Sequence, residues 1–145
     1  MPLLDEKTKN DVAALLSEIN GAAKMIVFTQ DFECQFCRET REIAEEIAAL
    51  SDKVSVEVLD FQEDAEKAEA LRIDKIPAMA ILGENGEDYG VRYYGIPSGY
   101  EFSSLLHDLK AVAAGPAGSE LSEETLKYLD ELEGELHLQV FVTPT

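Results

Sequence analysis

Cys34 and Cys37 are the residues whose type and spacing point most directly to chemistry. They are the only two cysteines among the 145 residues of the chain. Thiol–disulfide exchange needs an exposed thiolate as nucleophile and a second thiol that can resolve the mixed disulfide. The C-x-x-C spacing supplies both. The pair is therefore predicted to be a redox site, with Cys34 as the nucleophile and Cys37 as the resolving thiol.

Three other interpretations of the cysteine pair are open at this point. Buried cysteines without chemistry are common in protein cores. A zinc site needs four ligands, usually from two Cys or His pairs, whereas His107 and His137 are isolated in the sequence. A metal or iron–sulfur site shared between chains could use two cysteines from each. The spacing favours the redox pair, for which we expect no metal and no cofactor besides the disulfide.

The segment around the cysteines must provide a strand, a turn and a helix. Residues 24–30 contain the apolar run Met-Ile-Val-Phe, which is typical of a strand covered on both faces. A helix is predicted over residues 34–50, with Cys37 on its inner face. A thiolate at the start of a helix is stabilised by unpaired N–H groups and by the helix dipole. Arg38 could add positive potential, while Asp31 and Glu33 act in the opposite direction.

The elements before the last thirty residues predict an α/β fold. An Asn-Gly pair at residues 85–86 indicates a hairpin, and Ser98 with Glu101 indicates a helix N-cap. This order of elements implies a central mixed four-stranded sheet with helices on both faces and an extra N-terminal helix. The remaining predicted helices are 5–20, 62–72 and 98–113, and the remaining strands are 54–60, 76–82 and 89–94.

The last part of the chain looks like a restart of the first. Residues 1–113 form the predicted main domain, 114–120 a linker, and 121–145 a helix followed by a strand at 136–142. The segment Val140–Thr143 repeats the apolar-strand-then-Thr pattern of Ile26–Thr29, which is a weak internal repeat. We therefore expect residues 121–145 to open a second unit. An unpaired strand there could also add to a sheet or mediate a homodimer.

Composition and charge limit the partners and the location that we expect. Thirty acidic residues against twelve basic ones give a formal charge of −18, which opposes binding to nucleic acids and to anionic membranes. No apolar run approaches the length of a membrane span, and the N-terminus lacks the features of a signal peptide. We expect a cytoplasmic protein with protein partners.

Residues 22–113 resemble the thioredoxin/glutaredoxin fold. The resemblance is based on the C-x-x-C pair, on Ile76-Pro77 and on Gly95. It implies that Ile76-Pro77 lies opposite the cysteines with a cis peptide bond, and that Ile76 and Pro77, together with Phe36, shape a substrate groove.

A narrower resemblance extends over nearly the whole chain. The stretches Tyr89–Pro97 and Val140–Thr145 resemble the tandem glutaredoxin-like protein disulfide oxidoreductases of archaea and thermophilic bacteria, which join two units with a C-x-x-C each. The resemblance implies protein thiols and disulfides as substrates, and an electron donor like thioredoxin reductase.

The chain departs from the thioredoxin pattern at two places. The dipeptide between the cysteines is Gln-Phe, and Phe28 occupies the place of the buried aspartate of thioredoxins. Glu57 and Asp60, on the next strand, are candidates for a substitute proton acceptor. The direction of the reaction, whether reduction, oxidation or isomerisation, stays open.

One alternative is a non-catalytic acidic docking domain whose parent protein performs redox chemistry in a second unit. A fragment of a flavin-linked peroxide-reducing system is a further variant. However, no G-x-G-x-x-G motif is present to support a bound flavin or nucleotide.

Overall fold

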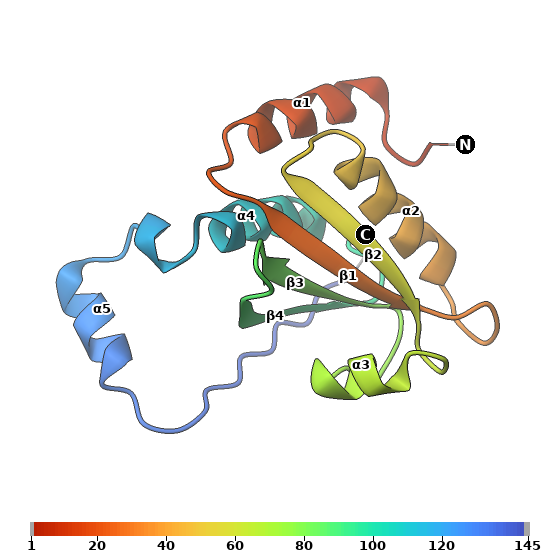
Figure 1. Cartoon of the computed structure of the whole chain (residues 1–145). Helices are drawn as coiled ribbons and strands as arrows, with labels where there is room; N and C mark the ends of the chain where they lie inside the picture. Colours follow the sequence, from red (N-terminus) through yellow and green to blue (C-terminus); the bar gives the residue numbers. More distant parts are fainter. Residues whose placement is uncertain (1, 144–145) are drawn as a thin grey trace.

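A four-stranded mixed sheet forms the centre of the molecule, in the order β2-β1-β3-β4 (Figure 1). The computed structural model describes residues 2–143. Strand β1 runs parallel to β2 and antiparallel to β3, and β3 runs antiparallel to β4. The strands are β1 (Ala23–Thr29), β2 (Val54–Asp60), β3 (Ala78–Gly83) and β4 (Asp88–Tyr94). The predicted α/β architecture is confirmed.

The burial of each strand follows its position in the sheet. All six residues of β3 are buried, and four consecutive residues of β1, from Met25 to Phe28, are buried as well. These two central strands are covered on both faces, as their continuous apolar runs indicate. The edge strands β2 and β4 are only partly buried.

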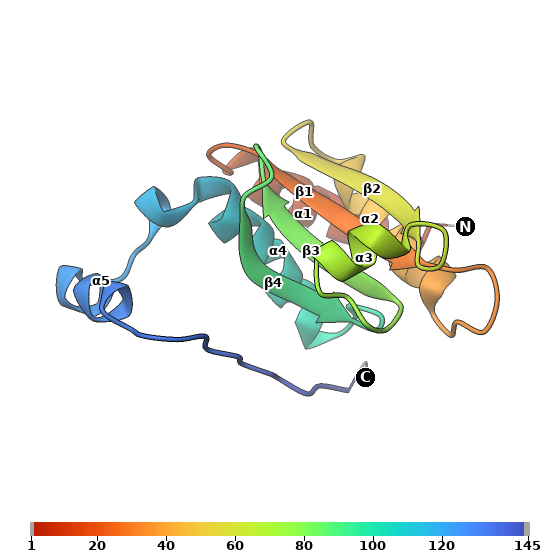
Figure 2. The same ribbon diagram turned by 60° about the horizontal axis from the view of Figure 1, so that its bottom comes forward.

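Helices cover both faces of the sheet, as Figures 1 and 2 show. Helices α1 (Glu6–Ser17), α2 (Cys37–Ala48) and α4 (Tyr100–Ala114) share one face, where their apolar residues meet Met25 and Val27 in the larger core cluster. The short α3 (Ala65–Ala70) lies on the other face, over the cluster that contains Ile26 and Phe28. Among residues 2–143, no helix has the length and apolar character needed to cross a bilayer.

Some predicted helix limits were wrong. Helix α2 begins at Cys37 and not at Cys34, because the preceding residue Phe36 has a left-handed backbone (φ 68°) and cannot continue the helix. Helix α4 is preceded by Gly99 at φ 63°, without a side-chain cap, so the predicted cap at Ser98 was also wrong. Helix α3 spans six residues, which is shorter than predicted.

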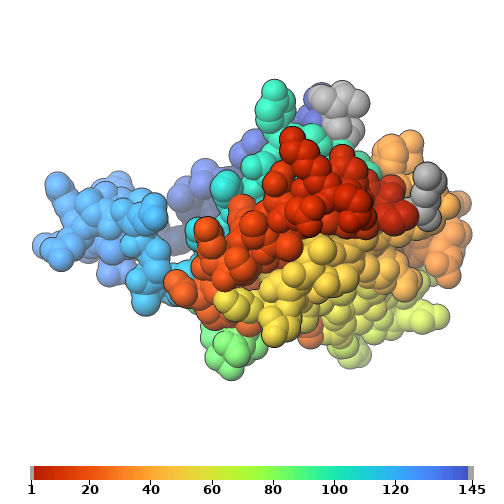
Figure 3. Space-filling view, turned by 90° about the horizontal axis from the view of Figure 1, so that it is seen from above, coloured from red at the N-terminus to blue at the C-terminus, as the bar shows by residue number. Residues whose placement is uncertain are grey.

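The chain after α4 leaves the body at α5, and the segment after α5 runs back beside the body (Figure 2). A 3₁₀ turn (Pro116–Gly118) follows α4, and α5 (Glu123–Asp130), capped by Ser122, projects from one side of the molecule (Figure 3). The strand predicted at 136–142 was wrong, since residues 135–143 contain no regular structure and pair with no strand of the sheet. A strand needs a neighbour for its backbone groups. The role of 121–145 as the start of a second unit stays a prediction; its residues 144–145, like Met1 of the first domain, lie outside the described residues.

Candidate functional site

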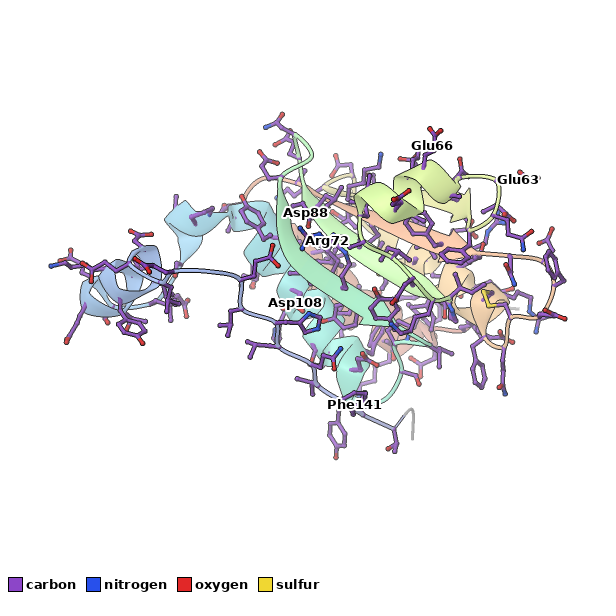
Figure 4. All side chains as sticks on the ribbon, turned by 90° about the horizontal axis from the view of Figure 1, so that it is seen from below. Glu63, Glu66, Arg72, Asp88, Asp108 and Phe141 are labelled. Carbon is purple, nitrogen blue, oxygen red and sulfur yellow. A yellow bond between two sulfur atoms is a disulfide. The ribbon has the colours of Figure 1, made fainter. Side chains whose placement is uncertain are left out.

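The two cysteines form a disulfide at the start of α2, with their Cα atoms 5.6 Å apart. In Figure 4 the bond is the yellow link beside the first turn of this helix. The side chain of Cys37 is only 4% exposed, whereas Cys34, in the preceding turn, is partly exposed. One sulfur therefore lies nearer to solvent than the other. The roles of nucleophile and resolving thiol remain predictions.

The turn before α2 has two left-handed residues that are not glycine. Glu33 has φ 47° and Phe36 has φ 68°, and each such conformation costs on the order of 1–3 kcal/mol. The side-chain amide of Gln30 donates a hydrogen bond to the carbonyl of Phe32 (2.8 Å), and the backbone N–H of Thr40 donates one to the carbonyl of Phe36 (2.9 Å). These contacts order the turn and start the helix directly after it.

The charged residues of the first turns of α2 form ion pairs with one another. The pKa of Glu39 is lowered, first by a hydrogen bond from its own backbone N–H and then by Arg38. Arg38, whose side chain is 78% exposed, lies 3.1 Å from Glu39 and 3.9 Å from Glu42. The pKa-tuning role of Arg38 stays a prediction. Sequence reasoning missed Glu39, which its place in the first helical turn could have revealed.

The segment Ile76-Pro77 lies at the same end of the sheet as the cysteine turn. Phe28 of β1 pairs with Ala78 of β3, so the residues after Phe28 and before Ala78 emerge together. The Ile76–Pro77 peptide bond is cis. The carbonyl of Pro77 accepts a hydrogen bond from the N–H of Gly95 (2.9 Å), which attaches this segment to the end of β4.

A groove of about 880 Å³ begins beside the cysteine turn and runs along α3. Gln30, Phe61, Ile73 and Ile76 contribute to its lining, which also includes charged residues. Ile76 therefore lies where a substrate segment could contact it. Pro77 is buried, and Phe36, 41% exposed, lies outside this groove. The substrate-binding roles of these residues stay predictions.

The contacts of Glu57 and Asp60 do not match the predicted role of proton acceptor for the thiols. Glu57 accepts hydrogen bonds from Lys24 and, at 3.3 Å, from Lys67 of α3, and these lower its pKa, with Lys24 as the largest cause. It therefore faces α3, on the side of the sheet opposite α2. Asp60 accepts the N–H groups of residues 62 and 63 at 2.8 and 3.0 Å. Their role in tuning the thiols stays a prediction that these contacts do not support.

Thr40 is a buried polar residue close to the cysteines in the sequence, which sequence reasoning missed. Its side chain is buried one turn after Cys37, and its hydroxyl oxygen has no hydrogen-bond partner among the described residues. The spacing of Cys37, Thr40, Ala44 and Ile47 is that of one helix face, so the sequence contained the signal. The described residues include no cluster of three or more His, Cys, Asp or Glu that could hold a metal ion.

The chain is similar to parts of longer curated oxidoreductases. It is 28% identical over 139 residues to the F component of the alkyl hydroperoxide reductase of Xanthomonas campestris pv. phaseoli, a match that covers 96% of this chain and 23% of the relative. It is 30% identical over 103 residues to an NADH dehydrogenase of Bacillus subtilis, covering 71% of this chain and 17% of the relative. The chain thus spans about a quarter or less of the length of these relatives. No family model matches.

Among solved structures, a protein disulfide oxidoreductase from Aeropyrum pernix superposes with a TM-score of 0.84 at 22% identity. The superposition covers 98% of this chain and 62% of that one. At this level of identity the likeness concerns the fold. Together with the sheet order and the helices on both faces, it shows that the chain has the thioredoxin-like fold expected from the sequence.

Proposed function

We propose that this chain is a thiol–disulfide oxidoreductase that acts on protein disulfides by dithiol exchange at Cys34 and Cys37. The observation that supports this most strongly is the unequal burial of a disulfide at a helix start. The partly exposed sulfur can attack a disulfide of another protein, or be attacked by its thiolate. The buried sulfur next to it can then resolve the mixed disulfide. The thioredoxin-like fold and the oxidoreductase names of the relatives agree with this proposal.

In the reducing direction the proposed exchange has two steps. The Cys34 thiolate attacks one sulfur of the substrate disulfide, so that a mixed disulfide forms and one substrate thiolate leaves. The Cys37 thiolate then attacks the Cys34 sulfur, which regenerates the Cys34–Cys37 disulfide and releases the second substrate thiolate. Two electrons pass from the dithiol to the substrate, and the two released thiolates take up protons from water. In the oxidising direction the same steps run backwards.

The proposed substrates are extended segments of other proteins that contact Ile76, Pro77 and Phe36. The groove beside Ile76 has apolar walls at Phe61 and Ile73, and such walls suit an apolar side chain next to the substrate cysteine. The formal charge of −18 favours neutral or basic substrates. We further propose a cytoplasmic location, no cofactor besides the disulfide, and an electron donor like thioredoxin reductase.

Trapping of the mixed disulfide tests the assignment of the two cysteines. Because Cys37→Ser removes the resolving thiol, the reduced variant is expected to accumulate a covalent adduct with a disulfide-containing protein such as insulin. Cys34→Ser removes the nucleophile and should form no adduct. Mass spectrometry without reductant measures both results, and adduct formation to the same extent by the two variants would overturn the assignment.

Reduction of insulin by the wild-type chain, with dithiothreitol as electron source, tests the activity itself. Turnover that disappears in Cys34→Ser supports the proposal. A disulfide that cannot be reduced, or a dithiol that does not react with protein disulfides, would contradict it and would favour the non-catalytic docking domain.

The similarity to the F component of alkyl hydroperoxide reductases favours a second candidate function. In this role the same dithiol would pass electrons to the disulfide of a peroxide-reducing protein. The match covers 96% of this chain, and the matched part includes the segment that contains both cysteines. Stopped-flow oxidation of the reduced chain by a purified peroxide-reducing protein should then be faster than its oxidation by insulin. Equal or slower oxidation would leave the general protein-disulfide activity as the better proposal.

A further inference from the structure

Thr40 has a side chain that the fold buries without giving it a partner. It is 1% exposed, and it is the only polar residue in the buried class among residues 2–143. Its Oγ1 is also the only buried side-chain nitrogen or oxygen in that range without a hydrogen bond. Leaving such a group unpaired costs about 1–3 kcal/mol, and native proteins keep few of them. The unpaired hydroxyl therefore needs an explanation.

The position of Thr40 suggests a hydrogen-bond partner for its hydroxyl in the reduced protein. It follows Cys37 by three residues on α2, and on a helix the Cβ atoms of such residues are about 5–6 Å apart on the same face. Both side chains are buried, at 1% and 4% exposure. The carbonyl of Phe36 accepts the backbone N–H of Thr40 at 2.9 Å, while the hydroxyl bonds to no carbonyl of the preceding turn.

The carboxylates that the sequence offered for this part of the site are engaged elsewhere. Phe28, where thioredoxins have an aspartate, is fully buried and cannot accept a proton. Glu57 binds Lys24 and Lys67 on the opposite face of the sheet, and Asp60 caps the turn that follows β2. None of these three residues is thus in a position to act on the buried thiol of Cys37.

We propose that Thr40 is a positioning residue for the resolving step: its hydroxyl donates a hydrogen bond to the Cys37 thiolate in the reduced protein and so favours attack on the Cys34 sulfur. In the disulfide state the Cys37 sulfur carries no charge and accepts hydrogen bonds weakly, which explains the unpaired hydroxyl. In the mixed disulfide, Cys37 loses its proton to water and becomes a strong acceptor. The hydroxyl keeps its own proton throughout, and its hydrogen bond is released as the new S–S bond forms.

This inference rests on the proposed dithiol exchange, and a single-turnover experiment separates its two steps. The reduced chain is mixed with one equivalent of the chromogenic disulfide 5,5′-dithiobis(2-nitrobenzoic acid). Attack by Cys34 releases the first coloured thiolate at a rate that depends on protein and reagent concentration. Attack by Cys37 releases the second in a first-order phase, which reports the resolving step directly.

Thr40→Val removes the hydroxyl and keeps the shape of the side chain. Because a hydrogen bond to a charged group contributes about 1.5–3 kcal/mol, and because the thiolate without it is also more nucleophilic, the second phase at neutral pH is expected to slow by roughly four- to fifteenfold. The first phase should be unchanged. The pH profile of the second phase should shift upward by about one unit or more and reach at least the wild-type plateau at high pH, where the thiolate forms without help.

Thr40→Ser keeps the hydroxyl and is expected to restore most of the resolving rate. The melting temperature of oxidised Thr40→Val should not fall, because the variant loses an unpaired buried polar group. A second phase that is unchanged in Thr40→Val, a pH profile that does not shift, or equal slowing of both phases would overturn the proposal.

The wild-type traces also separate this proposal from the proposed function. A wild-type chain that shows both phases but leaves insulin disulfides intact would contradict the protein-disulfide activity alone, and the Thr40 comparison would still hold. Release of only the first thiolate by the wild type would contradict dithiol exchange and, with it, the role of Thr40.

Discussion

At the scale of single residues, the site combines one partly exposed and one buried sulfur, with the exposed acids Asp31 and Glu33 in the same turn. Arg38 is paired with Glu39 and Glu42, and Glu57 is paired with two lysines. Besides the acids Asp31 and Glu33, the start of α2 and the Thr40 hydroxyl are the groups that we expect to act on the thiolates. Most ion pairs elsewhere in the described residues join residues that are close in the sequence.

Arg92 forms an ion pair within β4 and also reaches a second element. Its guanidinium binds both carboxylate oxygens of Asp88, at 2.9 and 2.7 Å, and donates to the carbonyl of Leu71 at 3.0 Å. It thereby attaches β4 to the end of α3. The pKa of Asp88 is lowered chiefly by Arg92, and Arg72, close to Asp88 in Figure 4, adds to this shift.

Asp88→Asn is expected to lower the free energy of unfolding at neutral pH by up to about 1 kcal/mol, given the partial exposure of the pair. Since the pKa of Asp88 is lower in the folded state, its contribution is fully present above its unfolded pKa and is lost as the pH falls through the folded one. The difference from wild type should therefore shrink below about pH 4 in urea titrations.

Asp74→Asn is the matched control for this titration. Asp74 pairs only with its neighbour Lys75 at an exposed position, and its replacement should leave the stability unchanged. A difference between Asp88→Asn and wild type that does not depend on pH would contradict the ion-pair explanation.

At the scale of elements, the fold depends on how α1 and α4 meet over one face of the sheet. The link from α1 to β1 passes Gly21, which has φ 88° and lies against the carbonyl oxygen of Ala113 near the end of α4. A Cβ at this position would overlap that oxygen. Tyr93 of β4 adds a second attachment, because its hydroxyl donates to Asp108 of α4; Figure 4 shows Asp108 below the sheet.

Gly21→Ala is therefore expected to destabilise the protein by roughly 2–5 kcal/mol, from the left-handed backbone and the overlap together. Gly86→Ala provides the control, because Gly86 has the same φ of 88° and no atom within 4 Å of its Cβ position. Gly86→Ala should lower the free energy of unfolding only by the cost of the left-handed backbone, roughly 1–2 kcal/mol. Equal losses in thermal unfolding would show that the contact with Ala113 is not important.

At the scale of the whole molecule, an acidic body is followed by an exposed apolar segment. Five apolar residues of this segment are between 52% and 89% exposed: Leu136, Leu138, Val140, Phe141 and Val142. In Figure 4, Phe141 lies at the outside of the molecule. Just before this segment, Glu135 forms a well-exposed ion pair with Arg72 of the body (3.4 Å). Exposed apolar segments of this kind favour association.

We predict that the chain self-associates through this segment, and that Leu138→Lys combined with Val140→Lys weakens the association without lowering the melting temperature. Because each chain has a formal charge of −18, salt should strengthen the association by screening repulsion. Sedimentation velocity at several protein and salt concentrations measures this. Undiminished association of the double variant would assign the contact to another surface.

Much of the fold and of the candidate site could be predicted from the sequence because the signals are local. The C-x-x-C spacing, the apolar runs of β1 and β3 and the Asn85-Gly86 hairpin each depend on neighbouring residues. The first residue of α2 was predicted wrongly because Phe36 adopts a left-handed backbone, which no local propensity favours for this residue. The strand at 136–142 was predicted from its composition, but a strand exists only where a partner supplies hydrogen bonds.

The sequence by itself indicated the type of chemistry, since two cysteines at this spacing suit thiol exchange and the sequence offers no matching second pair of metal ligands. It also determined the order of elements that brings them to the end of a central strand. Only the tertiary structure decided which of the candidate charged groups are engaged elsewhere. Burial, strand register and helix phase turned Glu57 toward α3 and buried the side chain of Thr40. These directions depend on how distant segments pack against each other, and no local pattern contains them.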